Sequence, residues 1–136
     1  MNLNQVTVPS SNVSRSIAFY RRLGLVLIVS SPPRYARFEC PNGDATFSVE
    51  QKDGAGGGGI TVYFECENVD ATVVGLRQQG IVIEEEPKDQ PWLWREAYLR
   101  DPDGNSLCLF TAGKNRKYPP WRVAAARKDT AAESSD

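Results

Sequence analysis

NVSRSIAFYRRLGL, at residues 12–25, recurs as NVDATVVGLRQQGI at residues 68–81. Asn68 follows Asn12 by 56 residues, and at this offset asparagine, valine, arginine and glycine recur in register. Each copy is predicted to be a helix. Asn12 or Ser14 in the first copy, and Asn68 or Asp70 in the second, can accept hydrogen bonds from first-turn N–H groups, and the glycine near each end suits a left-handed cap. Apolar residues at helical spacing support both helices: Val13, Ile17, Tyr20 and Leu23, and then Val69, Val73 and Leu76.

Strand-like runs surround both helices. One run precedes each helix, at 3–8 and 60–66, and three runs follow each, at 25–31, 34–40 and 45–51 and at 81–86, 92–100 and 106–111. Turn-forming segments at 41–44 and 101–105 join the last two runs of each set. Each half is therefore strand, helix and three strands, which predicts an α+β fold of two βαβββ modules, at about 3–51 and 60–111.

The chain length and the remaining segments fit one domain over 1–123. The link 53–59 is almost entirely glycine, which favours a flexible linker. A phosphate-binding loop is the weaker interpretation, because no Lys-Ser/Thr pair follows and the next element is a strand. The extension 112–123 is expected to be extended, with Tyr118 and Trp121 packing on the domain or on a partner chain. Residues 124–136 are short of apolar side chains and are expected to fray.

Composition excludes several classes of function. The 16 basic and 17 acidic residues nearly cancel, so a nucleic-acid partner is not expected. No apolar run is long enough for a membrane span or an export signal, which predicts a soluble cytoplasmic protein. The three cysteines are expected to be reduced. The absence of histidine excludes imidazole catalysis and imidazole metal ligands.

Alternation along the strands separates a core face from a concave face. Pairing across the turn at 101–105 sets Leu99 opposite Leu107 and Tyr98 opposite Cys108, which leaves the leucines for the core. The concave face is then expected to carry aromatic and charged residues, a composition that suits a ligand pocket. Its expected members are Gln5, Thr7, Tyr35, Arg37, Glu39, Ser48, Glu50, Thr61, Tyr63, Glu65, Trp92, Trp94, Glu96, Tyr98, Cys108 and Phe110.

Three segments, in this order inside the doubled pattern, resemble the vicinal oxygen chelate superfamily of glyoxalases, bleomycin-resistance proteins and dioxygenases. They are NQVTV at 4–8, SRSIAFY with LGL at 14–25, and YLRDPDGN at 98–105. The resemblance covers about residues 3–111. It implies paired modules that form a curved mixed sheet around a cavity, and commonly a homodimer that binds small molecules.

Metal-using members of that family take histidine, glutamine or glutamate ligands from the first and last strand of each module. The resemblance places these positions at Gln5, Ser48, Thr61 and Cys108, with Glu50 in place of Ser48 if the turn is one residue different. Neutral amide and hydroxyl oxygens are poor ligands for a catalytic divalent ion. We therefore expect no metal and no cofactor.

Two functions remain open. The first is a metal-independent binding protein for a partly aromatic or cationic small molecule, resembling bleomycin-resistance proteins. The second is an enzyme, an isomerase, lyase or dioxygenase-like protein that uses Glu50 or Glu96 as a base or holds metal in a carboxylate site. Ion pairing of these glutamates with Arg37 or Arg95 is the plainer expectation, and Cys108 lacks a base that would make it a nucleophile. The expected ligand-binding residues are Gln5, Arg37, Ser48, Thr61, Tyr63, Trp92, Trp94, Glu96, Tyr98 and Cys108.

Overall fold

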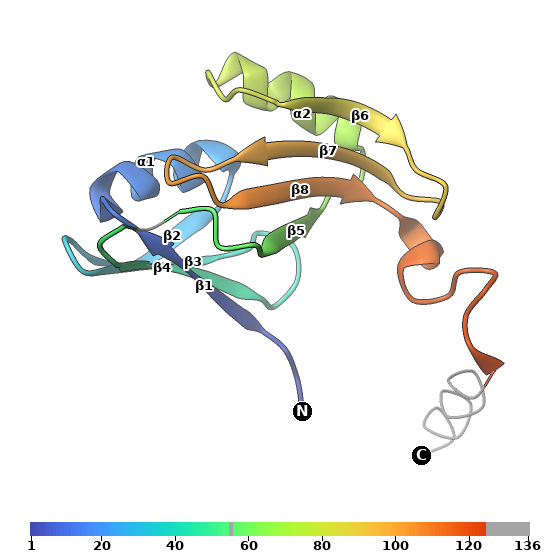
Figure 1. The fold of residues 1–136 in the computed structure, drawn as a ribbon, viewed down its shortest axis with the longest axis horizontal. Helices are drawn as coiled ribbons and strands as arrows, with labels where there is room; N and C mark the ends of the chain where they lie inside the picture. Colours follow the sequence, from blue (N-terminus) through green and yellow to red (C-terminus); the bar gives the residue numbers. More distant parts are fainter. Residues whose placement is uncertain (55, 125–136) are drawn as a thin grey trace.

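The fold consists of two βαβββ modules placed side by side, followed by a short C-terminal extension (Figure 1). The computed structural model describes residues 1–54 and 56–124. The first module contains β1 (Gln5–Ser10), α1 (Val13–Leu23), β2 (Val26–Ser31), β3 (Tyr35–Glu39) and β4 (Thr46–Gln51). The second contains β5 (Thr61–Glu65), α2 (Val69–Gln78), β6 (Glu85–Asp89), β7 (Arg95–Arg100) and β8 (Ser106–Thr111), and a 3-10 helix, η1 (Gly113–Arg116), follows it.

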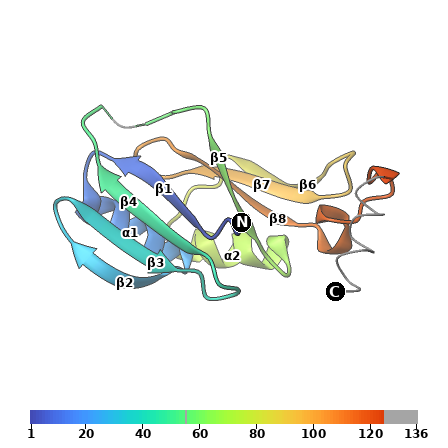
Figure 2. The same cartoon turned by 90° about the horizontal axis from the view of Figure 1, so that it is seen from below.

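Each module builds its own four-stranded mixed sheet. The strand orders are β1-β4-β3-β2 and β5-β8-β7-β6, and the first and last strands of each module pair in parallel. The other pairs are antiparallel, and Leu99 lies opposite Leu107 and Tyr98 opposite Cys108, as the turn at 101–105 predicts. One α-helix covers one face of each sheet, and among the described residues no α-helix covers the opposite face, which we call the helix-free face (Figures 1 and 2). The predicted α+β fold is confirmed.

The two predicted helices form because both ends of each are capped locally. The Asn12 side chain accepts a hydrogen bond from the Arg15 N–H at 3.0 Å, and Asn68 accepts from the Ala71 N–H at 3.1 Å. At the end of α1, Gly24 adopts a left-handed conformation with a φ of 112°. The alternative caps, Ser14 and Asp70, lie inside the helices.

A single core lies between the helices and the helix-facing sides of both sheets. Tyr20 is fully buried, and its ring lies 4.6 Å from the ring of Phe47. Phe47 in turn meets Phe64 of the second module at 5.8 Å, so aromatic contacts join the two modules. Cys40 is only partly buried but packs against this core.

Polar contacts also join the modules, at the turn that connects β7 to β8. Asp101, 5% exposed, accepts hydrogen bonds from the hydroxyl of Tyr20 (2.6 Å), from the side chain of Asn105 (2.8 Å) and from the N–H groups of Asp103 and Asn105 (2.9 Å each). Asn105 also donates to the carbonyl of Pro9 in the first module at 3.0 Å. The Asp103 carboxylate accepts from Ser11 and Arg15, and these bonds hold its pKa below the usual value although burial opposes them. We call this set the module joint.

The glycine-rich link packs against the module joint. Gly56 has a φ of 135°, and a Cβ at this position would overlap the carbonyl oxygen of Asp103. This part of the link therefore needs glycine for close approach as well as for its backbone conformation.

The starts of β6 and β7 and the conformation of the extension depart from the sequence-based expectation. Strand β6 begins at Glu85 and not near residue 81, because the Ile81 N–H still bonds the Leu76 carbonyl at the end of α2. Strand β7 begins at Arg95, because the preceding residues turn and the Leu93 N–H donates to the Gln90 carbonyl. The extension was expected to be extended but contains η1.

Other expectations concern the chain's ends and its surroundings. Tyr118 and Trp121 are about half exposed, so contacts within the domain do not bury them. The expectation of a frayed tail concerns residues 124–136, and all of these except 124 lie outside the described residues. No helix in the described ranges is long and apolar enough to cross a membrane.

Candidate functional site

The helix-free face of the first module carries mostly small polar side chains. The Thr46 hydroxyl donates to Oε1 of Gln5 at 2.8 Å, and Thr7 and Ser48 share a hydrogen bond of 2.6 Å. Ser48 is fully buried although it lies on this open face. Gln5 and Ser48 therefore form side-chain hydrogen bonds with neighbouring strands of their own sheet.

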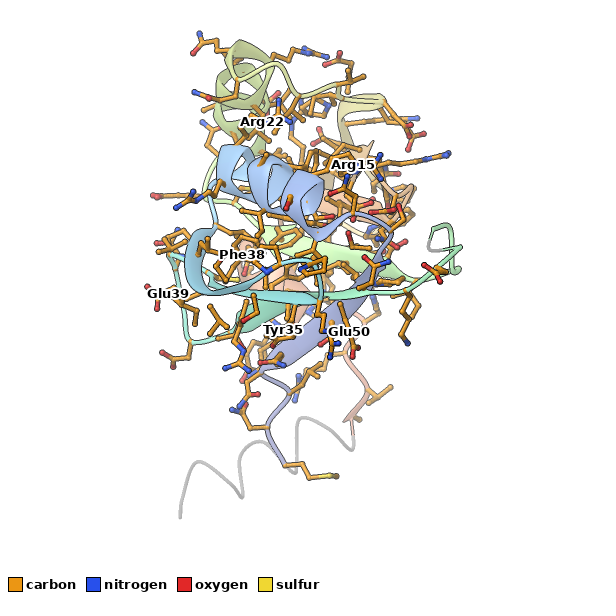
Figure 3. All side chains as sticks on the ribbon, turned by 90° about the vertical axis from the view of Figure 1, so that its left-hand side faces the viewer. Arg15, Arg22, Tyr35, Phe38, Glu39 and Glu50 are labelled. Atoms are coloured by element: carbon orange, nitrogen blue, oxygen red, sulfur yellow. The ribbon has the colours of Figure 1, made fainter. Side chains whose placement is uncertain are left out.

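Charged residues, among them Arg37 and Glu50, occupy the same face. Arg37 Nε donates to the hydroxyl of Tyr35 at 2.9 Å, and its guanidinium lies 5.5 Å from the centre of the Tyr35 ring. Glu50 is exposed and lies opposite Tyr35 in the strand ladder. Tyr35 and Glu50 point away from α1, whereas Phe38 lies between α1 and the sheet (Figure 3).

The helix-free face of the second module carries an aromatic cluster. Trp94 and Phe110 stack with ring centres 4.5 Å apart, and Tyr63 meets them edge-on at 6.1 Å and 5.9 Å. Phe110 is buried, whereas Tyr63 remains about half exposed. We call Tyr63, Trp94 and Phe110 the aromatic wall; it offers a partly open π surface to a ligand.

A buried carboxylate lies beside the aromatic wall. Glu96 is 2% exposed, and its two oxygens accept hydrogen bonds from Nε1 of Trp92 at 2.8 Å and from the Tyr98 hydroxyl at 2.9 Å. Both donors are neutral. Among residues 1–54 and 56–124 no basic side chain forms an ion pair with Glu96, including Lys88, which lies opposite it in the ladder. A buried charge without a counter-ion is costly, and an added cation would relieve that cost.

The expected ion pair between Glu96 and Arg37 or Arg95 is wrong. Arg95 points from β7 toward α2, where it binds both carboxylate oxygens of Asp70 at 2.7 and 2.9 Å. It also binds Asp89 on β6, at 3.1 Å. Arg37 belongs to the other sheet. Alternation explains the error: adjacent residues of a strand point to opposite faces, so Arg95 cannot share a face with Glu96.

The loop between β6 and β7 positions the indole that covers Glu96. Leu93 has a φ of 69°, a left-handed conformation that is unfavourable for leucine. Trp92, beside it, is 45% exposed while its Nε1 donates to Glu96. On the other side of the site, Nε1 of Trp94 donates to the Asn115 carbonyl in η1 at 3.3 Å. The extension thus supports the aromatic wall, a role that no sequence pattern indicated.

Thr61 and Cys108 lie on the same face as the aromatic wall. Thr61 donates to the Ser106 hydroxyl at 3.2 Å. Cys108 is fully buried; burial, and secondarily the charge of Glu96, raises its pKa to about 12. Burial likewise raises the pKa of Tyr98, which keeps its phenol a donor to Glu96. Cys108 is therefore a neutral thiol at physiological pH and no nucleophile.

The residues at the family's metal-ligand positions do not fit a divalent ion. Gln5 and Ser48 lie on the first sheet, and Thr61 and Cys108 lie on the second. Three of them are hydrogen-bonded to their own neighbours, and the fourth is a protonated thiol. In the described part of the chain, no three histidine, cysteine or acidic side chains gather where they could hold a metal.

The structure therefore divides the predicted site residues between two faces. Gln5, Arg37, Ser48 and Glu50 share the first sheet, and Thr61, Tyr63, Trp92, Trp94, Glu96, Tyr98 and Cys108 share the second. The second set converges on one carboxylate and one aromatic wall. The first set forms a polar strip without such a centre.

Comparison with known proteins agrees with this architecture. Residues 2–109 match the model of the Glyoxalase/Bleomycin resistance protein/Dioxygenase superfamily. Uncharacterized protein YraH of Bacillus subtilis (strain 168) is 28% identical in an alignment 127 positions long, and the match covers 81% of this chain and 98% of YraH. The antibiotic binding protein TnmS3 of Streptomyces sp. CB03234 has a similar fold, with a TM-score of 0.71 and 24% identity over 83% of this chain and 97% of TnmS3.

A lactoylglutathione lyase from Agrobacterium tumefaciens also shares the fold, with a TM-score of 0.69 and 20% identity over 83% of this chain and 94% of the lyase. At this identity the similarity establishes the architecture alone. The family match, by contrast, covers most of the chain and spans both modules. The chain belongs to the Glyoxalase/Bleomycin resistance protein/Dioxygenase superfamily.

Proposed function

We propose that this protein is a metal-independent small-molecule-binding member of its superfamily, and that it captures a planar aromatic cation on the helix-free face of the second module. The main support for this proposal is the environment of Glu96. This carboxylate is 2% exposed and lies beside the aromatic wall. It accepts hydrogen bonds from two neutral donors and has no counter-cation within the described residues. The structural similarity of this chain to an antibiotic binding protein supports a binding role by analogy.

The proposed ligand follows from charge and shape. A flat ring can lie against the partly exposed Tyr63, and a positive charge is attracted both to aromatic faces and to a desolvated carboxylate. Trp92 stands between Glu96 and solvent and is itself half exposed, so its indole has room to move aside as the cation approaches. The same carboxylate would repel an anionic ligand.

The test compares Glu96→Gln with Glu50→Gln in titrations of proflavine, a planar aromatic cation. Loss of the buried charge is expected to weaken proflavine binding about 10- to 100-fold, because a bond to a charged group contributes about 1.5–3 kcal/mol. Glu50→Gln, the matched change on the first module, is expected to leave affinity unchanged. The neutral ring system anthracene should show no such dependence. Equal affinity of wild type and Glu96→Gln, measured by tryptophan fluorescence, would refute the proposal.

The proposed absence of a metal can be tested separately from ligand binding. Elemental analysis of purified protein is expected to find no stoichiometric Mg, Mn, Fe, Ni or Zn, and these ions are expected to leave the Tm unchanged. The reason is the neutral donor set at Gln5, Ser48 and Thr61, combined with the protonated thiol of Cys108. Ligand binding to the native state alone should raise the Tm without metal. Retained metal that is lost in Glu96→Ala would instead favour a carboxylate metal enzyme.

We also propose that the protein acts as a homodimer. Tyr118 and Trp121, about half exposed on the extension, are suited to contact a second copy. Sedimentation at micromolar concentration is expected to give twice the 15.1 kDa chain mass. A 15.1 kDa species under these conditions would rule the dimer out.

A further inference from the structure

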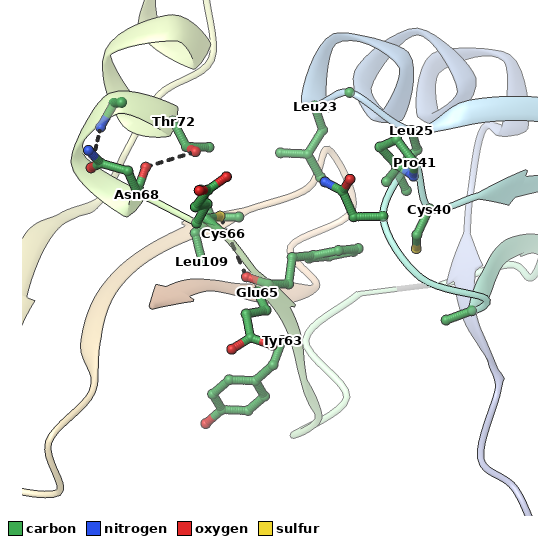
Figure 4. Close-up of a pocket in the computed structure, with 16 residues that line it drawn as sticks. Leu23, Leu25, Cys40, Pro41, Tyr63, Glu65, Cys66, Asn68, Thr72 and Leu109 are labelled. Atoms are coloured by element: carbon green, nitrogen blue, oxygen red, sulfur yellow. Dashed lines mark hydrogen bonds between the residues drawn. The ribbon is translucent and has the colours of Figure 1, made fainter. Parts of the chain in front are cut away.

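A cavity lies between the modules, and neither Glu96 nor its hydrogen-bond partners line it. Its volume is about 580 Å³, within the usual range for small-molecule sites. The end of α1 and the turn between β3 and β4 form one wall, and β5 with the first turn of α2 forms the other (Figure 4). Tyr63 is the one member of the aromatic wall that also borders this cavity. We call it the inter-module cavity.

The interior of the inter-module cavity is largely apolar. Leu23, Leu25, Phe64 and Leu109 contribute hydrocarbon surface, and Figure 4 shows Leu23 and Leu25 across the space from Thr72 and Cys66. Cys40 and Cys66 add two thiols whose pKa values are raised by burial. Both thiols therefore count as neutral, weakly polar surface. Such walls suit an aliphatic chain.

The charged groups that line the cavity are both acidic. Glu65 and Glu67 are exposed at its edge, and no lysine or arginine belongs to the described lining. Glu65 also approaches Arg116, with 3.7 Å between the charged atoms, so Glu67 carries the less compensated charge. The edge therefore favours a cation over an anion.

The N-terminus of α2 also borders this space, and an unoccupied helix N-terminus would favour an anion. Here two of its first-turn donors are engaged. The Val69 N–H donates to the Thr111 hydroxyl at 3.1 Å, and the Ala71 N–H donates to the Asn68 side chain at the same distance. The carboxylates of Glu65 and Glu67 consequently determine the charge of the ligand that binds at this edge of the cavity.

From these contacts we propose that the inter-module cavity binds a primary aliphatic amine. The hydrocarbon chain lies between Leu25, Phe64 and Leu109, and the ammonium group lies at the edge beside Glu65 and Glu67. Because both modules contribute walls, an occupant strengthens the contact between them. This site does not include Glu96, and Tyr63 is the member of the aromatic wall that it shares with the site proposed for the planar cation.

The probe is octylammonium, compared with octanoate and octanol, which carry the same chain. Octylammonium is expected to bind at least about tenfold more tightly than octanoate, because the two carboxylates attract one headgroup and repel the other. The double substitution Glu65→Gln with Glu67→Gln is expected to reduce octylammonium affinity roughly threefold, as exposed charges contribute modestly. Equal affinity for the amine and the carboxylate would overturn the proposal.

Two exposed alanines provide a matched pair for locating the site. Ala71 lines the cavity, whereas Ala18 lies on the exposed surface of α1 and is not part of the lining. Ala71→Phe is expected to abolish octylammonium binding, and Ala18→Phe is expected to leave it unchanged. Circular dichroism of both variants checks that each remains folded.

A second readout needs no variant. Bound octylammonium is expected to slow alkylation of Cys40 and Cys66 in the wild-type protein at least about tenfold, because both thiols line the cavity. Unchanged alkylation at saturating probe would overturn the proposal. Trp94→Ala separates the two sites: it is expected to weaken proflavine binding and to leave octylammonium binding intact. If Trp94→Ala removes both, octylammonium occupies the aromatic wall and the inter-module cavity is not its site.

Discussion

Asp101→Ala is expected to destabilise the protein by about 3–5 kcal/mol, because it leaves several buried donors of the module joint without an acceptor. The hydroxyl of Tyr20, the amide of Asn105 and two backbone N–H groups all donate to this one carboxylate. Tyr20 is fully buried, so water cannot replace the lost partner without rearrangement. Urea denaturation should show a lower midpoint at an unchanged slope.

Two further variants separate the parts of this effect. Tyr20→Phe removes one hydrogen bond and keeps the ring contact with Phe47, so a loss of only about 1.5 kcal/mol is expected. Asp101→Asn keeps one carbonyl acceptor for the turn, so its loss of stability should lie between those of Tyr20→Phe and Asp101→Ala. A loss below about 1 kcal/mol for Asp101→Ala would mean that the Asp101 carboxylate is not needed to hold the modules together.

Cys108 is expected to react with iodoacetamide at pH 8 about a thousandfold more slowly than an unperturbed thiol. Burial raises its pKa from 9.0 to about 12, so the reactive thiolate becomes about a thousandfold scarcer. Raising the pH toward 11 should increase the rate about tenfold per pH unit, because the pH then still lies below the pKa of Cys108 and the thiolate fraction grows tenfold with each unit. Mass spectrometry of peptides from a timed reaction measures the rate at each cysteine.

Glu96→Gln provides the control for this reactivity. The charge of Glu96 is the second cause of the raised pKa, so its removal should make Cys108 moderately more reactive, while Cys40 and Cys66 should be unaffected. Fast labelling of Cys108 in the native wild-type protein would contradict the description of this thiol as buried and protonated. It would also reopen a nucleophilic role.

The sequence was sufficient to predict the architecture because its determinants are local. The repeated asparagine caps and the helical spacing of apolar residues define both helices, and the turn at 101–105 fixes which residues of β7 and β8 pair. Edge strand β6 was placed less well. Its sequence, EEPKD, lacks apolar alternation and contains a proline that cannot donate to the ladder.

The sequence predicted which residues form the candidate site, but it did not predict the hydrogen bonds between them. Alternation correctly put Trp94, Glu96 and Phe110 on one face, yet it gave no indication that Trp92 and Tyr98 would donate to Glu96. Such partners depend on side-chain geometry across strands and loops. The inter-module cavity was not predicted at all, because its walls come from segments that meet only when the modules pack.

Among residues 1–54 and 56–124, no strand of one module pairs with a strand of the other. A change of register or side-chain size on one sheet therefore need not disturb the backbone ladder of its counterpart. The polar strip around Ser48 and the aromatic wall around Trp94 therefore lie on sheets whose surface side chains can differ without a shared backbone ladder to link them.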